Sequence, residues 1–163
     1  MLIKIKNKGE LIIDDFIFKC CIGKNGTKRK KIEGDKSTPK GIFTLGKLYY
    51  RSDKVSKPET SLLIKKINKK MGWCIESKNK KYNSEIIINK KIKHEKLFRK
   101  DNKYDYFLVI NYNTKKKIPF KGSAIFIHLT SNYHPTAGCI ALNKKDFLIL
   151  VKIINKKTKI KIS

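Results

Sequence analysis

Short apolar runs, interrupted repeatedly by turn-forming residues, constrain the fold of this chain most strongly. Residues 107–112 and 123–129 are continuous runs of apolar and β-branched residues, which is typical of strands near the centre of a sheet. Residues 2–6 and 11–22 flank Asn7-Lys8-Gly9, which predicts a hairpin, and residues 42–50 predict a further strand. The pattern therefore predicts a mainly β fold.

One clear helix is expected after residue 143. Asn143 can cap this helix, Asp146 follows three residues later, and one face carries apolar residues at helical spacing, namely Phe147, Leu150, Val151 and Ile154. We also expect a short helix in the middle of the chain, at residues 94–100, and a final strand at residues 158–162 that closes the sheet.

The length of 163 residues favours one domain, residues 1–163, with a single core. No run approaches the roughly 18 apolar residues that a membrane-spanning helix needs, so we expect no membrane span. The apolar stretch Leu11-Ile12-Ile13 is broken by Asp14 and Asp15, and no small-residue cleavage site follows, so no conventional export signal is visible.

The formal net charge of +27 raises the possibility of a nucleic-acid-binding protein. Lys and Arg together number 40, but only Arg29, Arg51 and Arg99 are arginine, the residue best suited to bidentate phosphate and base contacts. The lysines are spread along the whole chain, which favours a solvated lysine coat over a dedicated surface. We therefore expect no nucleic-acid partner, although the coat would attract polyanions in a salt-dependent way.

The four cysteines, Cys20, Cys21, Cys74 and Cys139, contain no C-x-x-C pair. A zinc ribbon or thioredoxin-type site is therefore not supported. Neighbours on a strand point to opposite faces, so Cys20 and Cys21 are poorly placed to serve one metal, and core packing is the simpler role for at least one of them. We expect no disulfide, no metal and no cofactor.

A histidine and a cysteine near the expected central strands point to chemistry. His128 ends an apolar strand, and Cys139 follows eleven positions later, directly after Gly138. A cysteine nucleophile needs a nearby base, because the thiolate is the reactive form and a free thiol titrates at about 8.5. Gly138 would let main-chain N–H groups approach a developing oxyanion. Spacing alone leaves a structural role for this pair open.

The motifs around this pair resemble those of the L,D-transpeptidase catalytic (YkuD-type) domain. The match is closest to a branch with the strand sequence SAIFIHL and a nucleophile loop of the form PTxGCIAL. Further family-like segments occur in the same order: residues 34–43, Gly72-Trp73-Cys74, Tyr82-Asn83, Arg99-Lys100-Asp101, Tyr104-Asp105 and Asn111-Tyr112-Asn113. The resemblance spans about residues 20–160, and several ordered motifs are far more specific than one Gly-Cys pair.

The resemblance implies a mainly β fold, a β-sandwich or mixed sheet. It also implies a peptidoglycan L,D-transpeptidase that acts through a cysteine thioester in the periplasm or cell wall. By motif position, Cys139 matches the nucleophile, His128 the general base, and Gly138 the residue whose backbone helps to orient the base and shape the oxyanion site. We expect Trp73, Tyr133 and Thr136 to contact the substrate, a stem peptide of peptidoglycan, and we expect a monomer.

The sequence departs from the wider family at two places near the nucleophile. Thr136-Ala137 precedes Gly138 where the family has His or a small hydroxyl residue, and Ala141 stands where Arg is common. The loop between His128 and Cys139 is also shorter than in many members. Since Ala141 is usual for the branch, these differences concern substrate details and not the chemistry.

Several alternatives remain open at this point. His134, five positions before Cys139, is a rival base, although it lies in a polar segment. A zinc site of His128, His134, Cys139 and Cys74 matches no usual ligand spacing. Residues 34–41 lack the Gly-Lys-Ser/Thr ending of a nucleotide loop, and we expect a tight connection beside the sheet. The runner-up functions are an L,D-carboxypeptidase or other hydrolase using the same residues, and a non-catalytic basic binding module.

Overall fold

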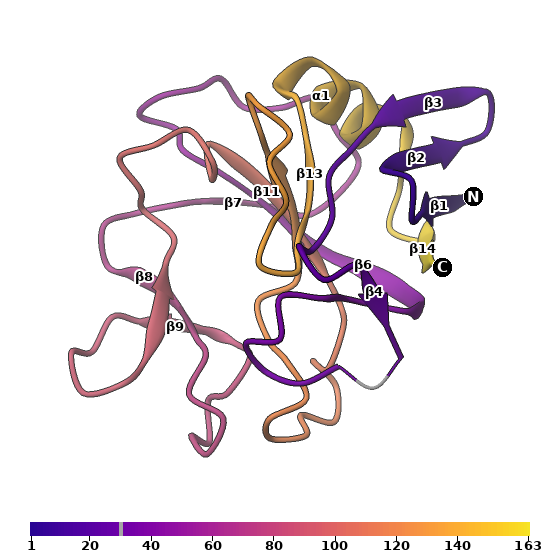
Figure 1. Ribbon diagram of the computed structural model, residues 1–163. Helices are drawn as coiled ribbons and strands as arrows, with labels where there is room; N and C mark the ends of the chain where they lie inside the picture. The colour runs from indigo at the N-terminus through magenta and orange to yellow at the C-terminus, as the bar shows by residue number, and fades with distance from the viewer. Residues whose placement is uncertain (30) are drawn as a thin grey trace.

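The computed structural model describes residues 1–29 and 31–163. The strands are β1 (Leu2–Lys6), β2 (Glu10–Ile13), β3 (Phe16–Lys19), β4 (Thr27–Lys28), β5 (Thr38–Pro39), β6 (Gly41–Tyr50), β7 (Ile64–Lys66), β8 (Met71–Cys74), β9 (Glu85–Ile87), β10 (His94–Lys96), β11 (Tyr106–Ile110), β12 (Phe126–Leu129), β13 (Ile140–Leu142) and β14 (Lys159–Ile162). The helix is α1 (Lys144–Ile153) (Figure 1). The predicted mainly β, mixed-sheet architecture is confirmed.

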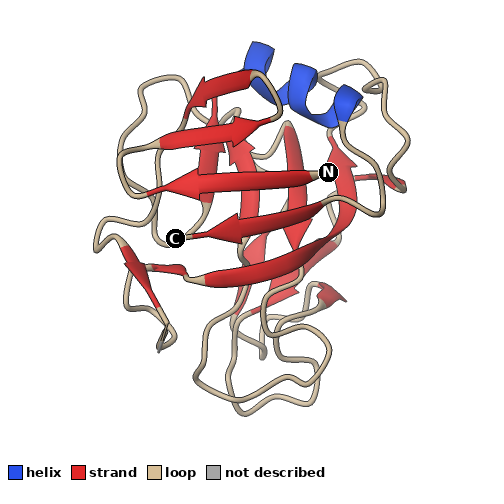
Figure 2. Cartoon of the chain, turned by 90° about the vertical axis from the view of Figure 1, so that its right-hand side faces the viewer, coloured by secondary structure: helices blue, strands red, loops and turns tan. Residues whose placement is uncertain are grey.

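The main sheet has nine strands in the order β13-β12-β11-β6-β14-β1-β2-β3, with β7 added beside β6. The long strand β6 joins its two halves, because its first residues pair with β14 and its last residues pair with β11. Figure 2 shows the strands next to the two termini crossing in front of the remaining strands, with the helix at one end. The sheet therefore folds back on itself and encloses a core.

Two hydrophobic clusters lie on opposite faces of β11 and β12. The first core lies between the two halves of the sheet and α1, and includes Leu108, Ile110, Ile127 and Phe147. The second core includes Phe107, Val109, Phe126 and Cys139, and packs under the small sheet β10-β8-β9. Because successive side chains of a strand alternate, β11 is buried on both faces, which explains its uninterrupted apolar sequence.

The helix forms where the sequence predicts it. The side chain of Asn143 accepts a hydrogen bond from the N–H of Asp146, and Phe147, Leu150 and Val151 are buried against the first core. The expected hairpin at Asn7-Lys8-Gly9 is also present, with Gly9 at a φ of 77°.

The predicted strand at residues 11–22 is wrong as a single element. Asp14 adopts a φ of 47°, and the chain reverses there so that β2 and β3 pair, with Ile13 opposite Phe16. Asp tolerates this left-handed conformation and favours tight turns, which outweighs the continuity of the apolar pattern. The result leaves Ile17 exposed on the edge strand β3.

The predicted short middle helix is also wrong. Residues His94–Lys96 form strand β10, with Glu95 opposite Trp73 in the small sheet. Pairing with β8 and burial of the following Leu97 in the second core decide this segment, and both are tertiary interactions that local sequence does not reveal.

The C-terminal strand is present but does not close the sheet at its edge. Strand β14 lies between β6 and β1, antiparallel to the former and parallel to the latter. Among the described residues, no helix is long and apolar enough to cross a membrane.

Candidate functional site

Strand β12 presents His128 toward the second core. Its side chains alternate, so that Phe126 and His128 share one face while Ile127 and Leu129 enter the first core. The imidazole is 2% exposed and lies edge-on to the Tyr104 ring, with 5.6 Å between the ring centroids.

The hydrogen bonding of His128 selects one tautomer. Nδ1 lies 2.9 Å from the carbonyl oxygen of Leu129, which can only accept, so Nδ1 carries the proton. Nε2 is buried and has no hydrogen-bond partner in the described part of the chain. Burial, reinforced by the positive charge of Lys103, lowers the pKa of His128 to about 3. At neutral pH, the ring is therefore a neutral imidazole with a free lone pair on Nε2.

Cys139 lies on the same face as His128. Strand β13 runs parallel to β12 with Ile140 opposite Ile127 and Ala141 opposite His128, and Cys139 directly precedes it. This register brings Cys139 beside Phe126 in the second core. His128 lies two residues beyond Phe126 on the adjacent strand β12. Parallel pairing of β12 and β13 therefore brings together two residues that the sequence separates by eleven positions.

Segment 124–126 holds the Cys139 sulfur. The thiol donates to the carbonyl oxygen of Ala124 at 3.2 Å, and Sγ accepts from the N–H of Phe126 at 3.4 Å. Burial raises the pKa of Cys139 to about 11, although the Phe126 N–H and Lys103 act in the opposite direction. The structure therefore contains a neutral thiol and a neutral imidazole that are not hydrogen-bonded to each other.

Gly138 occupies a backbone position that excludes other residues. Its φ is 138°, and a Cβ atom there would lie 2.8 Å from the carbonyl oxygen of Ser37. The hydroxyl of Thr38 donates to the Gly138 carbonyl at 2.9 Å and accepts from the Gly23 N–H at 2.8 Å. Residues 34–41 thus form a connection packed directly against the loop between β12 and β13, residues 130–139, which we call the cysteine loop.

The three predicted substrate contacts occupy different environments. Thr136 is half-buried; its hydroxyl donates to the Cys139 carbonyl and accepts from the Gly138 N–H. Tyr133 is half-buried, and its hydroxyl accepts from the Asn143 side chain at 2.7 Å. Trp73 is 6% exposed and packs edge-on against Phe126 in the second core. Of these three residues, only Thr136 lines the open cavity beside His128.

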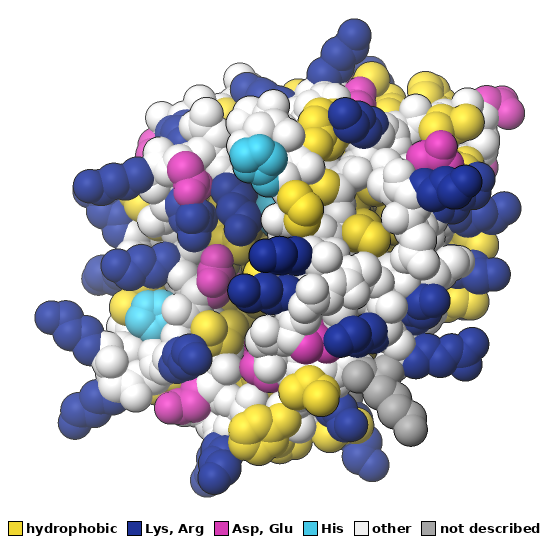
Figure 3. All heavy atoms as spheres, viewed as in Figure 1, with side chains coloured by type: hydrophobic (Ala, Val, Ile, Leu, Met, Phe, Trp, Pro, Cys, Tyr) yellow, Lys and Arg dark blue, Asp and Glu magenta, His cyan; other side chains and the backbone are white. Residues whose placement is uncertain are grey.

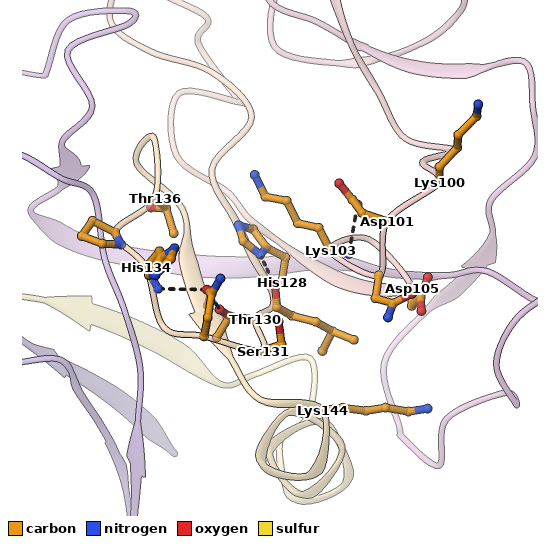
Figure 4. Close-up of a pocket in the computed structure, with 15 residues that line it drawn as sticks. Lys100, Asp101, Lys103, Asp105, His128, Thr130, Ser131, His134, Thr136 and Lys144 are labelled. Atoms are coloured by element: carbon orange, nitrogen blue, oxygen red, sulfur yellow. Dashed lines mark hydrogen bonds between the residues drawn. The ribbon is translucent and has the colours of Figure 1, made fainter.

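An open cavity of about 740 Å³ lies beside His128. Its lining includes Lys100, Asp101, Lys103, His128, His134 and Thr136, and Figure 4 shows His128 between Lys103 and the pair His134 and Thr136. Cys139 is not part of this lining and is 9% exposed.

His134 also lines the cavity but is exposed, and its main-chain N–H donates to Asn132 Oδ1. No group of three or more His, Cys, Asp or Glu side chains in the described part of the chain is arranged to hold a metal ion, and all four cysteines are free thiols. The proposed zinc set is therefore not assembled.

Charged residues missed by the sequence argument border the site. The Tyr104 hydroxyl donates to Glu95 at 2.9 Å, and Arg99 pairs with Asp101 through two of its nitrogens. The positive charge of Lys103 acts to lower the pKa of both His128 and Cys139. One lysine among so many, however, could not be singled out from the sequence. Arg99, Asp101 and Tyr104 lay in motifs noted above, but without a role.

A solved structure shares the fold of this chain. None of the curated proteins matches this chain. Among solved structures, the helical cell shape determining protein Pgp2 (K307A mutant) from Campylobacter jejuni is similar, with a TM-score of 0.51 and 19% identity. The match covers 99% of this chain and 46% of that one, so this chain spans about half of its length. At this identity, the likeness concerns the fold.

The model of the L,D-transpeptidase catalytic domain matches residues 3–162, which is nearly the whole sequence and includes both His128 and Cys139. On the strength of this match, the chain belongs to the L,D-transpeptidase catalytic domain family.

Proposed function

We propose that this protein is a peptidoglycan L,D-transpeptidase that cross-links stem peptides through a thioester on Cys139. The observation that carries the proposal is the position of His128. Its Nε2 is buried and unpartnered in the described structure, its Nδ1–H is held by Leu129, and it shares a sheet face with Cys139. A base held in one tautomer next to a thiol is the arrangement that nucleophilic cysteine chemistry requires.

The first half-reaction begins with proton transfer. Because the thiol donates to the Ala124 carbonyl, it has to turn toward His128 Nε2 before the proton can move. The sulfur then attacks a peptide carbonyl carbon of the donor stem, forming a C–S bond and a tetrahedral oxyanion. Collapse breaks the C–N bond, His128 gives its proton to the leaving amine, and a thioester remains.

In the second half-reaction, an amine of a second stem attacks the thioester carbonyl. His128 accepts the proton of that amine, a new peptide bond forms, and the C–S bond breaks. The proton returns to the sulfur, which regenerates the thiol. Replacing the amine by water gives a shortened stem instead, so hydrolysis and transfer use the same groups.

Gly138 is proposed to orient the base and shape the oxyanion site through its backbone. Its own N–H donates to Thr136, so the oxyanion donors in this proposal are other main-chain N–H groups near Cys139. Thr136 lines the cavity, and we propose that it contacts the stem peptide there; Tyr133 and Trp73 do not line this cavity, and their contact with the substrate stays a prediction. We propose that the protein acts in the periplasm or cell wall, where its substrate occurs.

The proposal is tested with isolated muropeptides that carry tetrapeptide or pentapeptide stems, with products separated by mass. A transpeptidase gives dimers with loss of one residue or short fragment, and the position of the new bond identifies the donor carbonyl. If only shortened monomers form, the protein is a carboxypeptidase and not a transpeptidase. Unchanged muropeptides from a folded sample, over several stem lengths, would overturn both and leave a binding module.

A further inference from the structure

A buried asparagine holds the backbone that contacts the Cys139 sulfur. Asn83 lies in the connection between β8 and β9, is 3% exposed and has a φ of 52°. Asparagine tolerates this left-handed conformation better than most residues. Its main-chain N–H donates to Cys74 at 2.9 Å, which fixes its backbone to the end of β8.

The Asn83 side chain uses its full hydrogen-bonding capacity. Oδ1 accepts from Trp73 Nε1 at 2.9 Å and from the Ala124 N–H at 3.0 Å. Nδ2 donates to the carbonyl oxygens of Tyr112 and Asn113, each at 2.9 Å. An amide has two donors and an acceptor oxygen with two lone pairs, so the group is saturated. It joins three segments that are distant in the sequence.

One of these four bonds ends next to the sulfur. Ala124 has a φ of 52°, which is uncommon for a residue with a Cβ atom, so contacts outside its own backbone have to maintain this conformation. Its N–H is held by Asn83, and its carbonyl oxygen accepts the Cys139 thiol. Two residues further on, the Phe126 N–H donates to the same sulfur. The segment from Ala124 to Phe126 therefore accepts one hydrogen bond from the Cys139 thiol and donates another to its sulfur.

We propose that Asn83 is a positioning residue for the nucleophile, acting through Ala124 to fix the place and burial of the Cys139 thiol. The proposal rests on the function assigned above to Cys139, but its physical content concerns only the thiol. Without Asn83, the backbone at Ala124 can relax to a more common φ. The sulfur then loses its fixed contacts and gains access to water.

The test compares Asn83→Ala with Asn79→Ala. Asn79 lies in the same connection, where its side chain bonds Glu76 and the Lys81 N–H at 2.9 Å each without reaching Ala124. Alkylation of Cys139 by iodoacetamide is followed by mass spectrometry as a function of pH, with muropeptide turnover measured in parallel. The groups that act on the sulfur electrostatically, Lys103, Glu95, Lys31 and Tyr104, are the same in both variants.

In Asn83→Ala, we expect the midpoint of the alkylation profile to move down toward the value of about 8.5 for a free thiol. Alkylation near neutral pH then becomes about tenfold faster or more, since each unit of pKa is a factor of ten in thiolate. Turnover falls by about 10–100-fold through kcat, because misplacement of reacting atoms by about 1 Å carries such a cost. Asn79→Ala should resemble the wild type in both assays.

If Asn83 only stabilised the fold, Asn83→Ala would lower the melting temperature without making alkylation faster and turnover slower. An unchanged alkylation profile in folded Asn83→Ala would therefore overturn the proposal. Should that variant fail to fold, amide hydrogen exchange of the wild type decides. Protection of the Ala124 N–H supports the proposal, and exchange as fast as an exposed loop amide overturns it. If wild-type turnover is absent, the assigned function fails while the alkylation and exchange results still test Asn83.

Discussion

At the scale of single residues, the folded chain holds Cys139 and His128 in their neutral forms. Burial favours the uncharged form of both groups, so it raises the pKa of Cys139 and lowers that of His128. In addition, the Cys139 thiol donates to the Ala124 carbonyl and not to His128 Nε2. In the proposed reaction, the thiol therefore has to reorient toward His128 before its proton can move.

Cys139→Ala should abolish turnover while retaining the fold, because a small side chain replaces another small one. His128→Ala should lower kcat by about 10²–10⁴-fold, the usual value of a general base. Muropeptide assays monitor both changes, with Cys20→Ala as a control for the loss of a buried thiol. A larger effect of His134→Ala than of His128→Ala would show that the base has been assigned wrongly.

The depressed pKa of His128 predicts a loss of stability in acid. Unfolded protein binds a proton at this residue below about pH 6.5, whereas the folded protein resists protonation until about pH 3. Between these values the unfolded state binds more protons, so the free energy of unfolding falls as pH falls. Urea unfolding at pH 7, 5 and 4 should show that the difference between wild type and His128→Gln changes by several kcal/mol, in the direction that disfavours the wild type in acid. A difference that does not vary with pH would contradict the burial argument.

At the scale of elements, residues 22–24 and residues 34–41 both contact the cysteine loop. Residues 34–41 bring Ser37 and Thr38 against Gly138, and Thr136 ties the loop to residues 22–24 through main-chain bonds. Strand β13 continues directly from this loop. The position of Cys139 is thus set from both ends, by a strand on one side and by a packed loop on the other.

Thr38→Val tests this link. The substitution keeps the volume of the side chain but leaves the Gly23 N–H and the Gly138 carbonyl without their partner. Each unsatisfied buried group costs about 1–3 kcal/mol, so the free energy of unfolding should fall by a few kcal/mol, and turnover should fall as well. The control is Thr60→Val, at a half-buried residue whose hydroxyl accepts one hydrogen bond, from the Leu62 N–H at 3.2 Å. Equal stability of the two variants in urea titrations would rule out this role for Thr38.

At the scale of the whole molecule, the chain is organised around one folded-over sheet and a dispersed positive charge. Figure 3 shows Lys and Arg side chains scattered over the visible face and not gathered in one patch. This distribution agrees with the interpretation of the lysines as a solvated coat. The sheet, by contrast, depends on its C-terminal strand, because β14 lies between β6 and β1 and so connects the two halves.

Deletion of residues 159–163 should therefore prevent folding and not merely trim an edge. Without β14, the strands β1–β3 lose their pairing with the rest of the sheet, and Ile160 and Ile162 leave the first core. Circular dichroism and limited proteolysis would detect the loss, with Lys161→Ala as a control on the exposed side of the same strand. A cooperative melting transition near that of the full chain would refute this dependence.

Local sequence determined the features that depend on periodicity and turn chemistry. The apolar run of β11, the capped helix at Asn143 and the turn at Gly9 follow from side-chain alternation, capping and backbone freedom. The motifs around His128 and Cys139 identified the family, because residue type and order are properties of the chain itself.

Tertiary structure decided everything that depends on which segments meet. It made residues 94–96 a strand, broke residues 11–22 at Asp14, and inserted β14 inside the sheet. It also brought Asn83, Ala124 and Cys139 together from three separate segments, and buried the thiol and the imidazole so that both are neutral. Long-range pairing, burial and the resulting desolvation arise only when the chain is folded, so no local pattern in the sequence encodes them.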